Sequence, residues 1–188
     1  MRTLEVRRHT MRIQPGKHLS QAGVDLARQT GASIGPFDRV ITSKLPRAFE
    51  TAIAMGFAVD DQIGLLGSIS DAVSDEFDWT HGFPAVTAAV RKGDETARYA
   101  TKLARRWHSV VAGLPEGSRT LMISHGGIVE AGAAGCLPAA DHAAWGRALD
   151  YCEGIRLRHD GAGFTDIEII RLTDTPIDGR IIRYPPPR

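Results

Sequence analysis

Two histidines follow short apolar runs, and each stands among residues suited to binding an anion. Arg8 and His9 end the first run, and Ser124-His125-Gly126-Gly127 ends the second. Ends of parallel strands gather at one edge of a sheet, where such sheets bind ligands. Two imidazoles with arginines nearby suit a site that takes a phosphoryl group from an ester onto a ring nitrogen. A third segment, Thr42-Ser43-Lys44-Leu45-Pro46-Arg47, fits the same interpretation.

Strand and helix signals alternate in the first third of the chain. Residues 3–8 and 39–42 read as strands. A helix is expected from an N-cap at Ser20 to a C′ glycine at Gly31, and a second helix from Pro46 to a closing Gly56. The order strand-helix-strand-helix predicts a parallel sheet covered by helices.

The remaining two thirds are less regular but end in clear strand signals. Residues 58–94 suggest a short strand, an irregular excursion and a helix from Phe83. Apolar residues at three- and four-residue spacing predict a helix that ends near residues 113–115. The later elements expected are a buried strand at 119–124, a small-residue helix at 126–135, an antiparallel hairpin of 154–158 with 165–172, and an extended tail at 184–188.

Together these signals predict an α/β fold. We expect a three-layer α/β/α sandwich with a mostly parallel sheet and an antiparallel edge. The chain of 188 residues fits a single domain, 1–188, with an irregular insertion near residues 60–95.

Composition limits the partners and the compartment. The formal net charge of +1 gives no argument for binding nucleic acid, and no run approaches the roughly 20 apolar residues of a membrane span. The first residues lack the apolar stretch of a signal peptide. Cys136 and Cys152 lack metal-site spacing, so we expect free thiols and a cytoplasmic protein. The sequence gives no oligomeric state.

Four motifs in order resemble the histidine phosphatase superfamily, which includes cofactor-dependent phosphoglycerate mutases and histidine acid phosphatases. Val6-Arg7-Arg8-His9-Thr10 resembles the Arg-His-Gly signature, and Leu19-Ser20-Gln21-Ala22-Gly23 resembles a Leu-Thr-x-x-Gly helix start. Residues 43–52 resemble Ser-x-Leu-x-Arg-Ala-x-x-Thr-Ala, and residues 124–127 resemble the second-histidine motif.

The resemblance implies catalytic roles that agree with physical expectation. His9 would be the nucleophile, and Arg8, Arg47 and His125 would hold the phosphoryl oxygens. A nucleophilic imidazole must be neutral, and nearby cations disfavour its protonated form. Donors already in position stabilise the charge that spreads over the transferring oxygens.

Further substrate contacts are expected around these four residues. Thr10 replaces the family's glycine after the nucleophile, and its hydroxyl is a candidate phosphate contact. Arg12 resembles the second arginine of the acid-phosphatase branch. Ser43 either caps the following helix or touches phosphate. Gly126 allows backbone amides to approach the ligand.

The proton donor is the least defined part of the predicted site. Mutase-like members carry a glutamate in a Leu-x-Glu-Ile segment, where this chain has Ser68. Asp71 is the favoured replacement because it lies nearest that position. The other candidates are Asp75, Glu76, Asp78 and, after His125, Glu130.

The sequence therefore predicts a metal-independent phosphatase that works through a covalent phosphohistidine intermediate. The expected partner is a small phosphorylated substrate or a phosphohistidine protein, with no cofactor. A mutase-type phosphotransferase and a non-catalytic phospholigand-binding protein are the alternatives. The remaining histidines have no metal-binding spacing, and His18 and His81 are weak candidates for lining the pocket.

Overall fold

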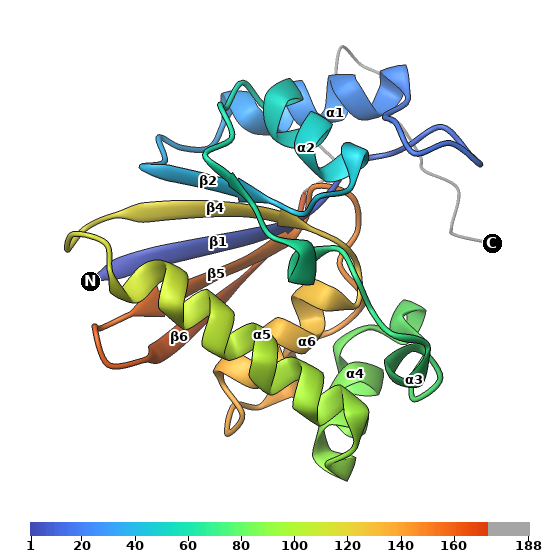
Figure 1. Cartoon of the computed structure of the whole chain (residues 1–188), viewed down its shortest axis with the longest axis vertical. Helices are drawn as coiled ribbons and strands as arrows, with labels where there is room; N and C mark the ends of the chain where they lie inside the picture. Colours follow the sequence, from blue (N-terminus) through green and yellow to red (C-terminus); the bar gives the residue numbers. More distant parts are fainter. Residues whose placement is uncertain (173–188) are drawn as a thin grey trace.

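A six-stranded mixed sheet forms the centre of the molecule, for which the computed structural model describes residues 1–172 (Figure 1). The strand order is β3-β2-β4-β1-β5-β6. The strands are β1 (Arg2–Arg8), β2 (Arg39–Thr42), β3 (Asp61–Gln62), β4 (Arg119–Ser124), β5 (Gly154–His159) and β6 (Phe164–Ile170). The four strands from β3 to β1 in this order run parallel, whereas β5 and β6 form the antiparallel edge.

Helices cover both faces of the sheet, as the sequence predicted (Figure 1). The helices are α1 (Gln21–Ala32), α2 (Pro46–Ala54), α3 (Asp71–Ser74), α4 (Gly82–Lys92), α5 (Glu95–Ala112) and α6 (Ile128–Cys136). Helices α1 and α2 lie on one face, and α5 and α6 lie on the other, where α4 packs against both. The fold is therefore a three-layer α/β/α sandwich.

Local signals explain where α1 begins and where α2 begins and ends. Ser20 caps α1, because its side chain accepts a hydrogen bond from the Gly23 amide. Pro46 occupies the first turn of α2, and Gly56, at a φ of +90°, follows its end.

The predicted role of Gly31 is wrong. Helix α1 continues to Ala32, so Gly31 lies inside the helix. A Cβ atom at Gly31 would lie 2.0 Å from the Met55 carbonyl oxygen. The glycine therefore permits close packing of the helix against the end of α2 and does not end the helix.

The core has two parts that correspond to the two helical layers. The larger cluster includes Leu4, Trp107 and Met122, and the smaller includes Ala27, Ala52 and Ile123. In the larger cluster, a Cβ atom at Gly132 of α6 would lie 2.1 Å from the Trp107 ring. The small-residue composition of α6 therefore lets it pack tightly on α5.

The segment between β3 and α5 is the irregular part of the described chain. It contains two 3₁₀ turns, η1 (Gly64–Leu66) and η2 (Trp79–His81), as well as α3 and α4. The predicted tail at 184–188 lies outside the described residues. Within residues 1–172 no helix is long and apolar enough to span a membrane, and Cys136 and Cys152 are both free.

Candidate active site

The sheet brings three strand ends together at one edge. Strands β1 and β4 are parallel neighbours with Arg8 opposite Ser124, so His9 and His125 leave the sheet side by side. Their ring centroids lie 4.9 Å apart. Strand β2 flanks β4 on the other side, and the Ser43 amide donates to the Ile123 carbonyl at 3.0 Å. Ser43 therefore joins the two histidines at the same edge.

The hydrogen bonds of His9 define which ring nitrogen can react. Its Nδ1 lies 2.5 Å from the Thr10 carbonyl oxygen, which can only accept, so Nδ1 carries the proton. Its Nε2 accepts a hydrogen bond from Arg47 Nε at 3.1 Å. Nε2 is therefore unprotonated, and its lone pair faces Arg47. A nucleophilic imidazole needs such a free lone pair.

Burial and positive charge keep both imidazoles neutral. Each histidine is only 7% exposed. Burial first, and then Arg47, Arg8 and Arg12, lower the pKa of His9 to about 3. The pKa of His125 is lowered to about 2, first by burial and then by the neighbouring His9, Arg47 and Arg8. Both rings are therefore uncharged at neutral pH.

His125 is held by Ser43 and has one ring nitrogen without a partner. Its Nε2 lies 2.7 Å from Ser43 Oγ, which also accepts a hydrogen bond from the Leu45 amide at 3.3 Å. Helix α2 has Leu45 as its N-cap and no side-chain cap, so Ser43 contacts the second histidine and does not cap the helix. His125 Nδ1 is buried without a hydrogen-bond partner within residues 1–172.

Arg47 reaches His9 from the first turn of α2, where the helix dipole also favours an anion. A short relay fixes this helix to the nucleophile loop. The Thr51 hydroxyl donates to the Arg47 carbonyl at 2.6 Å and accepts from the Thr10 amide at 3.1 Å. Burial and the neighbouring Arg12 lower the pKa of Arg47.

Arg8 packs against two aromatic rings. Its guanidinium carbon is 5.0 Å from the centroid of the Trp79 ring and 4.5 Å from that of Tyr151. Its Nη1 donates to the Leu149 carbonyl at 2.7 Å, whereas its buried Nε has no hydrogen-bond partner within residues 1–172. The Arg8 guanidinium is therefore fixed at the site and keeps an N–H group, on Nε, that can donate to a ligand.

Other predicted contacts occupy fitting positions. Arg12 Nη1 donates to the Gly16 carbonyl at 2.8 Å, and Arg12 lowers the pKa of both His9 and Arg47. Thr10 is fully buried at a φ that is not positive, so its side chain is compatible with the backbone there. A Cβ atom at Gly126 would lie 3.1 Å from Trp79, so a larger side chain there would require the Trp79 ring to shift. Contacts of Thr10, Arg12 and Gly126 with substrate stay predictions.

Three of the five candidate proton donors are committed to structural hydrogen bonds. Glu76 accepts from the backbone amides of Glu95 and Thr96 and so caps α5. Asp78 caps η2 through the Thr80 amide. Asp71 and Asp75 lie exposed on the first turn and at the C-cap of α3. The choice of Asp71 as proton donor stays a prediction.

Glu130 is the third committed carboxyl group, and it is fully buried. Its Oε2 accepts from the Gly127 amide at 2.8 Å, and its Oε1 accepts from the Leu149 amide at 3.0 Å. Burial raises its pKa. Glu130 thus joins the loop after His125 to the loop that holds Arg8, an arrangement that favours a positioning role over proton donation.

The weaker histidine candidates form pairs with neighbouring acids. His18 pairs with Glu50 and His81 with Asp78, and both histidine side chains are at least 70% exposed. No group of three or more His, Cys, Asp or Glu residues that could hold a metal ion occurs in residues 1–172.

Sequence analysis missed Tyr151, Trp79 and Asp150. Tyr151 lies 6.0 Å from the His9 ring, and Asp150 Oδ1 lies 4.0 Å from Arg8 Nη1. One signal was available, because an antiparallel strand beside β1 must begin at the edge where β1 ends. The loop before β5 was therefore bound to reach the site. Trp79 lies in the irregular segment and gave no comparable signal.

Comparison with known proteins agrees with the motifs and the geometry. The model of the histidine phosphatase superfamily (branch 1) matches residues 2–170. The chain therefore belongs to this superfamily. No curated protein matches it.

Several solved structures share the fold. Phosphoserine phosphatase from Entamoeba histolytica is 17% identical, with a TM-score of 0.67, over 92% of this chain and 98% of that one. A mycobacterial glucosyl-3-phosphoglycerate phosphatase is 17% identical, with a TM-score of 0.61, over 92% of this chain and 100% of that one. Phosphoglycerate mutase from Thermus thermophilus is 16% identical, with a TM-score of 0.56, over 91% of this chain and 99% of that one.

Proposed function

We propose that this protein is a metal-independent phosphatase that hydrolyses a phosphomonoester or phosphohistidine through a phosphohistidine intermediate on His9. The observation that carries the proposal is the state of His9, a buried neutral imidazole with Nε2 facing Arg47 and Nδ1–H fixed by a carbonyl. Membership of the superfamily supports an enzyme of the phosphatase or mutase kind.

In the first step, His9 Nε2 attacks phosphorus and the bond from phosphorus to the leaving group breaks. The ring gains positive charge, which the Thr10 carbonyl stabilises through the Nδ1–H hydrogen bond. The guanidinium groups of Arg8 and Arg47 and the imidazole of His125 stabilise the phosphoryl oxygens. The leaving group takes its proton from an acid, for which we propose Asp71.

In the second step, water attacks phosphorus and the P–N bond breaks, while the carboxylate left on the proposed acid Asp71 takes the proton of the water and is restored. Inorganic phosphate leaves, and His9 returns to its neutral state. The ring leaves phosphorus as a neutral imidazole, because Nδ1 keeps its proton on the Thr10 carbonyl throughout. The free thiols of Cys136 and Cys152 support a cytoplasmic location as part of this proposal.

Hydrolysis is preferred to mutase activity because a mutase must keep water from its intermediate while the substrate reorients. The sequence offers one late candidate for a lid, the short and proline-rich segment of residues 174–188, and it lies outside the described residues. Transfer between the hydroxyls of a phosphoglycerate would identify a mutase, and phosphate binding without turnover would identify a binding protein.

The test is hydrolysis of p-nitrophenyl phosphate by wild type and by His9→Ala. Removal of the nucleophile is expected to lower kcat by about 10³-fold or more. Circular dichroism and thermal unfolding of both proteins serve as the control for folding. Wild-type turnover in a folded His9→Ala protein would contradict the covalent route.

A further inference from the structure

The loop of residues 147–153, which precedes β5, holds Arg8 at three points. The Arg8 amide donates to the Glu153 carbonyl at 2.8 Å, and the Arg8 carbonyl accepts from the Cys152 amide at 3.1 Å. Arg8 Nη1 donates to the Leu149 carbonyl at 2.7 Å. We call this segment the anchor loop, because the direction of the Arg8 side chain depends on it.

The anchor loop also brings its own side chains to the candidate site. The Tyr151 ring lies against the Arg8 guanidinium and 6.0 Å from the His9 ring. Asp150 holds the Tyr151 amide through Oδ1 at 2.7 Å. The position of this loop therefore sets the position of both Arg8 and Tyr151.

The anchor loop has a backbone conformation that needs support. Cys152 has a φ of +58° and is the only residue other than glycine with a positive φ in residues 1–172. Such a conformation is uncommon for a residue with a side chain and persists where surrounding contacts impose it. The loop must therefore be held by interactions beyond its own sequence.

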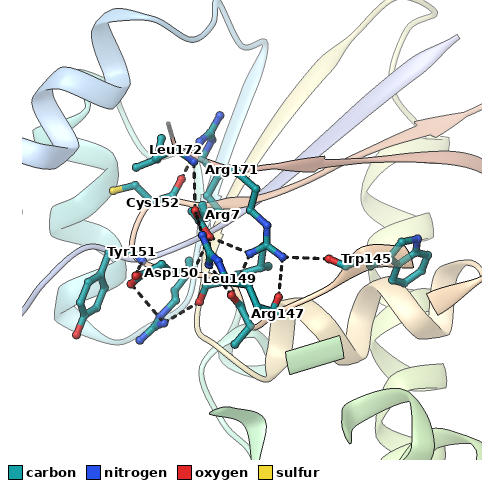
Figure 2. Close-up of polar contacts among 12 residues, drawn as sticks. Arg7, Trp145, Arg147, Leu149, Asp150, Tyr151, Cys152, Arg171 and Leu172 are labelled. Carbon is teal, nitrogen blue, oxygen red and sulfur yellow. Dashed lines mark hydrogen bonds and ion pairs between the residues drawn. The ribbon is translucent and has the colours of Figure 1, made fainter. Parts of the chain in front are cut away.

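Arg171 supplies that support from outside the anchor loop, by binding the carboxylate of Glu153 at the end of the loop. The Glu153 side chain is 2% exposed, and its carboxylate accepts from Arg147 and from the Asp150 amide. Arg171, just after β6, donates to the same carboxylate at 2.9 Å. The Arg171 guanidinium also donates to the backbone carbonyls of Arg147 and Ala148, at the start of the loop, and to that of Trp145 just before it (Figure 2).

We propose that Arg171, acting through Glu153 and the anchor loop, is a positioning residue that orients Arg8 and Tyr151 for binding a phosphoryl group. Arg171 donates to three carbonyls and one carboxylate, so it fixes the loop at several points at once. A lysine could not reproduce this, since an ammonium lacks the planar fork of donors. The inference rests on the proposed function.

Arg156 provides a matched control. It is also a half-buried arginine of the antiparallel edge, and it bridges two carboxylates, Glu5 and Glu168. Its side chain is 31% exposed and that of Arg171 is 26% exposed. Arg156 makes no direct side-chain hydrogen bond to the anchor loop and is linked to it only through Glu5 and Arg7, which donates to the Cys152 carbonyl. Arg156→Met therefore removes ion pairs at the same edge and keeps every direct contact of the loop.

The test is a double-mutant cycle between Arg171 and Arg8, measured both as vanadate affinity and as kcat/KM for p-nitrophenyl phosphate. Arg171→Met is expected to weaken vanadate binding by about tenfold, with Arg171→Lys between it and wild type. Arg156→Met should change the affinity by less than about twofold. In an Arg8→Ala background, Arg171→Met should cost less than about threefold, because the residue through which it acts is already gone.

The proposal would be overturned if Arg171→Met weakened vanadate binding by the same factor with and without Arg8. It would also be overturned if Arg156→Met weakened vanadate binding as much as Arg171→Met does. Glu153→Gln repeats the test if Arg171→Met does not fold. Failure of the proposed function is distinguishable: a wild type that binds vanadate and shows coupling but never turns over contradicts phosphatase activity and supports the positioning role. A wild type that turns over with additive effects contradicts only the positioning role.

Discussion

Lowering the pH should destabilise this protein through His9 and His125. Burial and the neighbouring cations depress their pKa values from 6.5 to about 3 and about 2 in the folded chain. Below pH 6.5 the unfolded chain takes up protons at these residues, whereas the folded chain does not. Stability is therefore present above pH 6.5 and is lost as the pH falls.

The loss can be worked from these values. At pH 5 each histidine should lower the free energy of unfolding by roughly 2 kcal/mol, since one pH unit corresponds to about 1.4 kcal/mol per proton. The pair would lower it by about 4 kcal/mol, a large share of the roughly 5–15 kcal/mol typical of a domain. His9 stays neutral throughout, so its own ionisation should not lower kcat between pH 7 and pH 5.

Urea unfolding at pH 7, 6 and 5 measures this effect, with a His9→Gln/His125→Gln protein as the control. Titration of His159, whose pKa is also lowered by burial, contributes equally to both proteins and cancels in the comparison. The double variant should lose about 4 kcal/mol less than wild type between pH 7 and pH 5. The same pH dependence in both proteins would refute the inference that these histidines are buried and neutral.

Three further predictions concern binding, proton donation and packing. Arg47→Lys should weaken vanadate binding by roughly 10- to 100-fold in a titration, because the guanidinium fork is lost; unchanged affinity would remove Arg47 from the anion site. Asp71→Asn should slow hydrolysis of an alkyl phosphate by ~10² to 10⁴-fold and of an aryl phosphate far less, and Asp75→Asn is its control. If both variants match wild type on the alkyl ester, α3 holds no general acid. Gly132→Ala should destabilise by about 1–3 kcal/mol in urea, because a Cβ atom would meet the Trp107 ring; Gly113→Ala, with no atom within 4 Å, should not.

Much of the fold could be predicted because local signals and the global arrangement agree. The capping serine at Ser20, the proline at Pro46 and the buried run at 119–124 each have one favourable structural meaning. Gly31 was misjudged because a glycine that permits close approach and a glycine that ends a helix look alike in sequence. The segment after β3 gave weak periodicity because short turns, capped by side chains, replace long amphipathic elements there.

The site residues that belong to sequence motifs could be predicted, whereas those that reach the site only through tertiary contacts could not. His9, Arg47 and His125 stand at strand ends or a helix start that the sequence marks. Glu130 is buried and accepts hydrogen bonds from two backbone amides because two loops that are distant in sequence meet around it. Sequence alone could not show this, so Glu130 stood among the candidate proton donors. Tyr151 belongs to no motif and reaches His9 only through the antiparallel placement of β5.

Trapping of the phosphorylated protein tests the central claim most directly. Rapid mixing of wild type with a radiolabelled phosphoester, followed by a base quench, should yield a phosphoprotein that is stable in base and labile in acid, with the label on the peptide that contains His9. His9→Ala should yield none, and His125→Gln should still bind label, more slowly. Turnover by wild type without any label on His9, or label at another residue, would contradict the account.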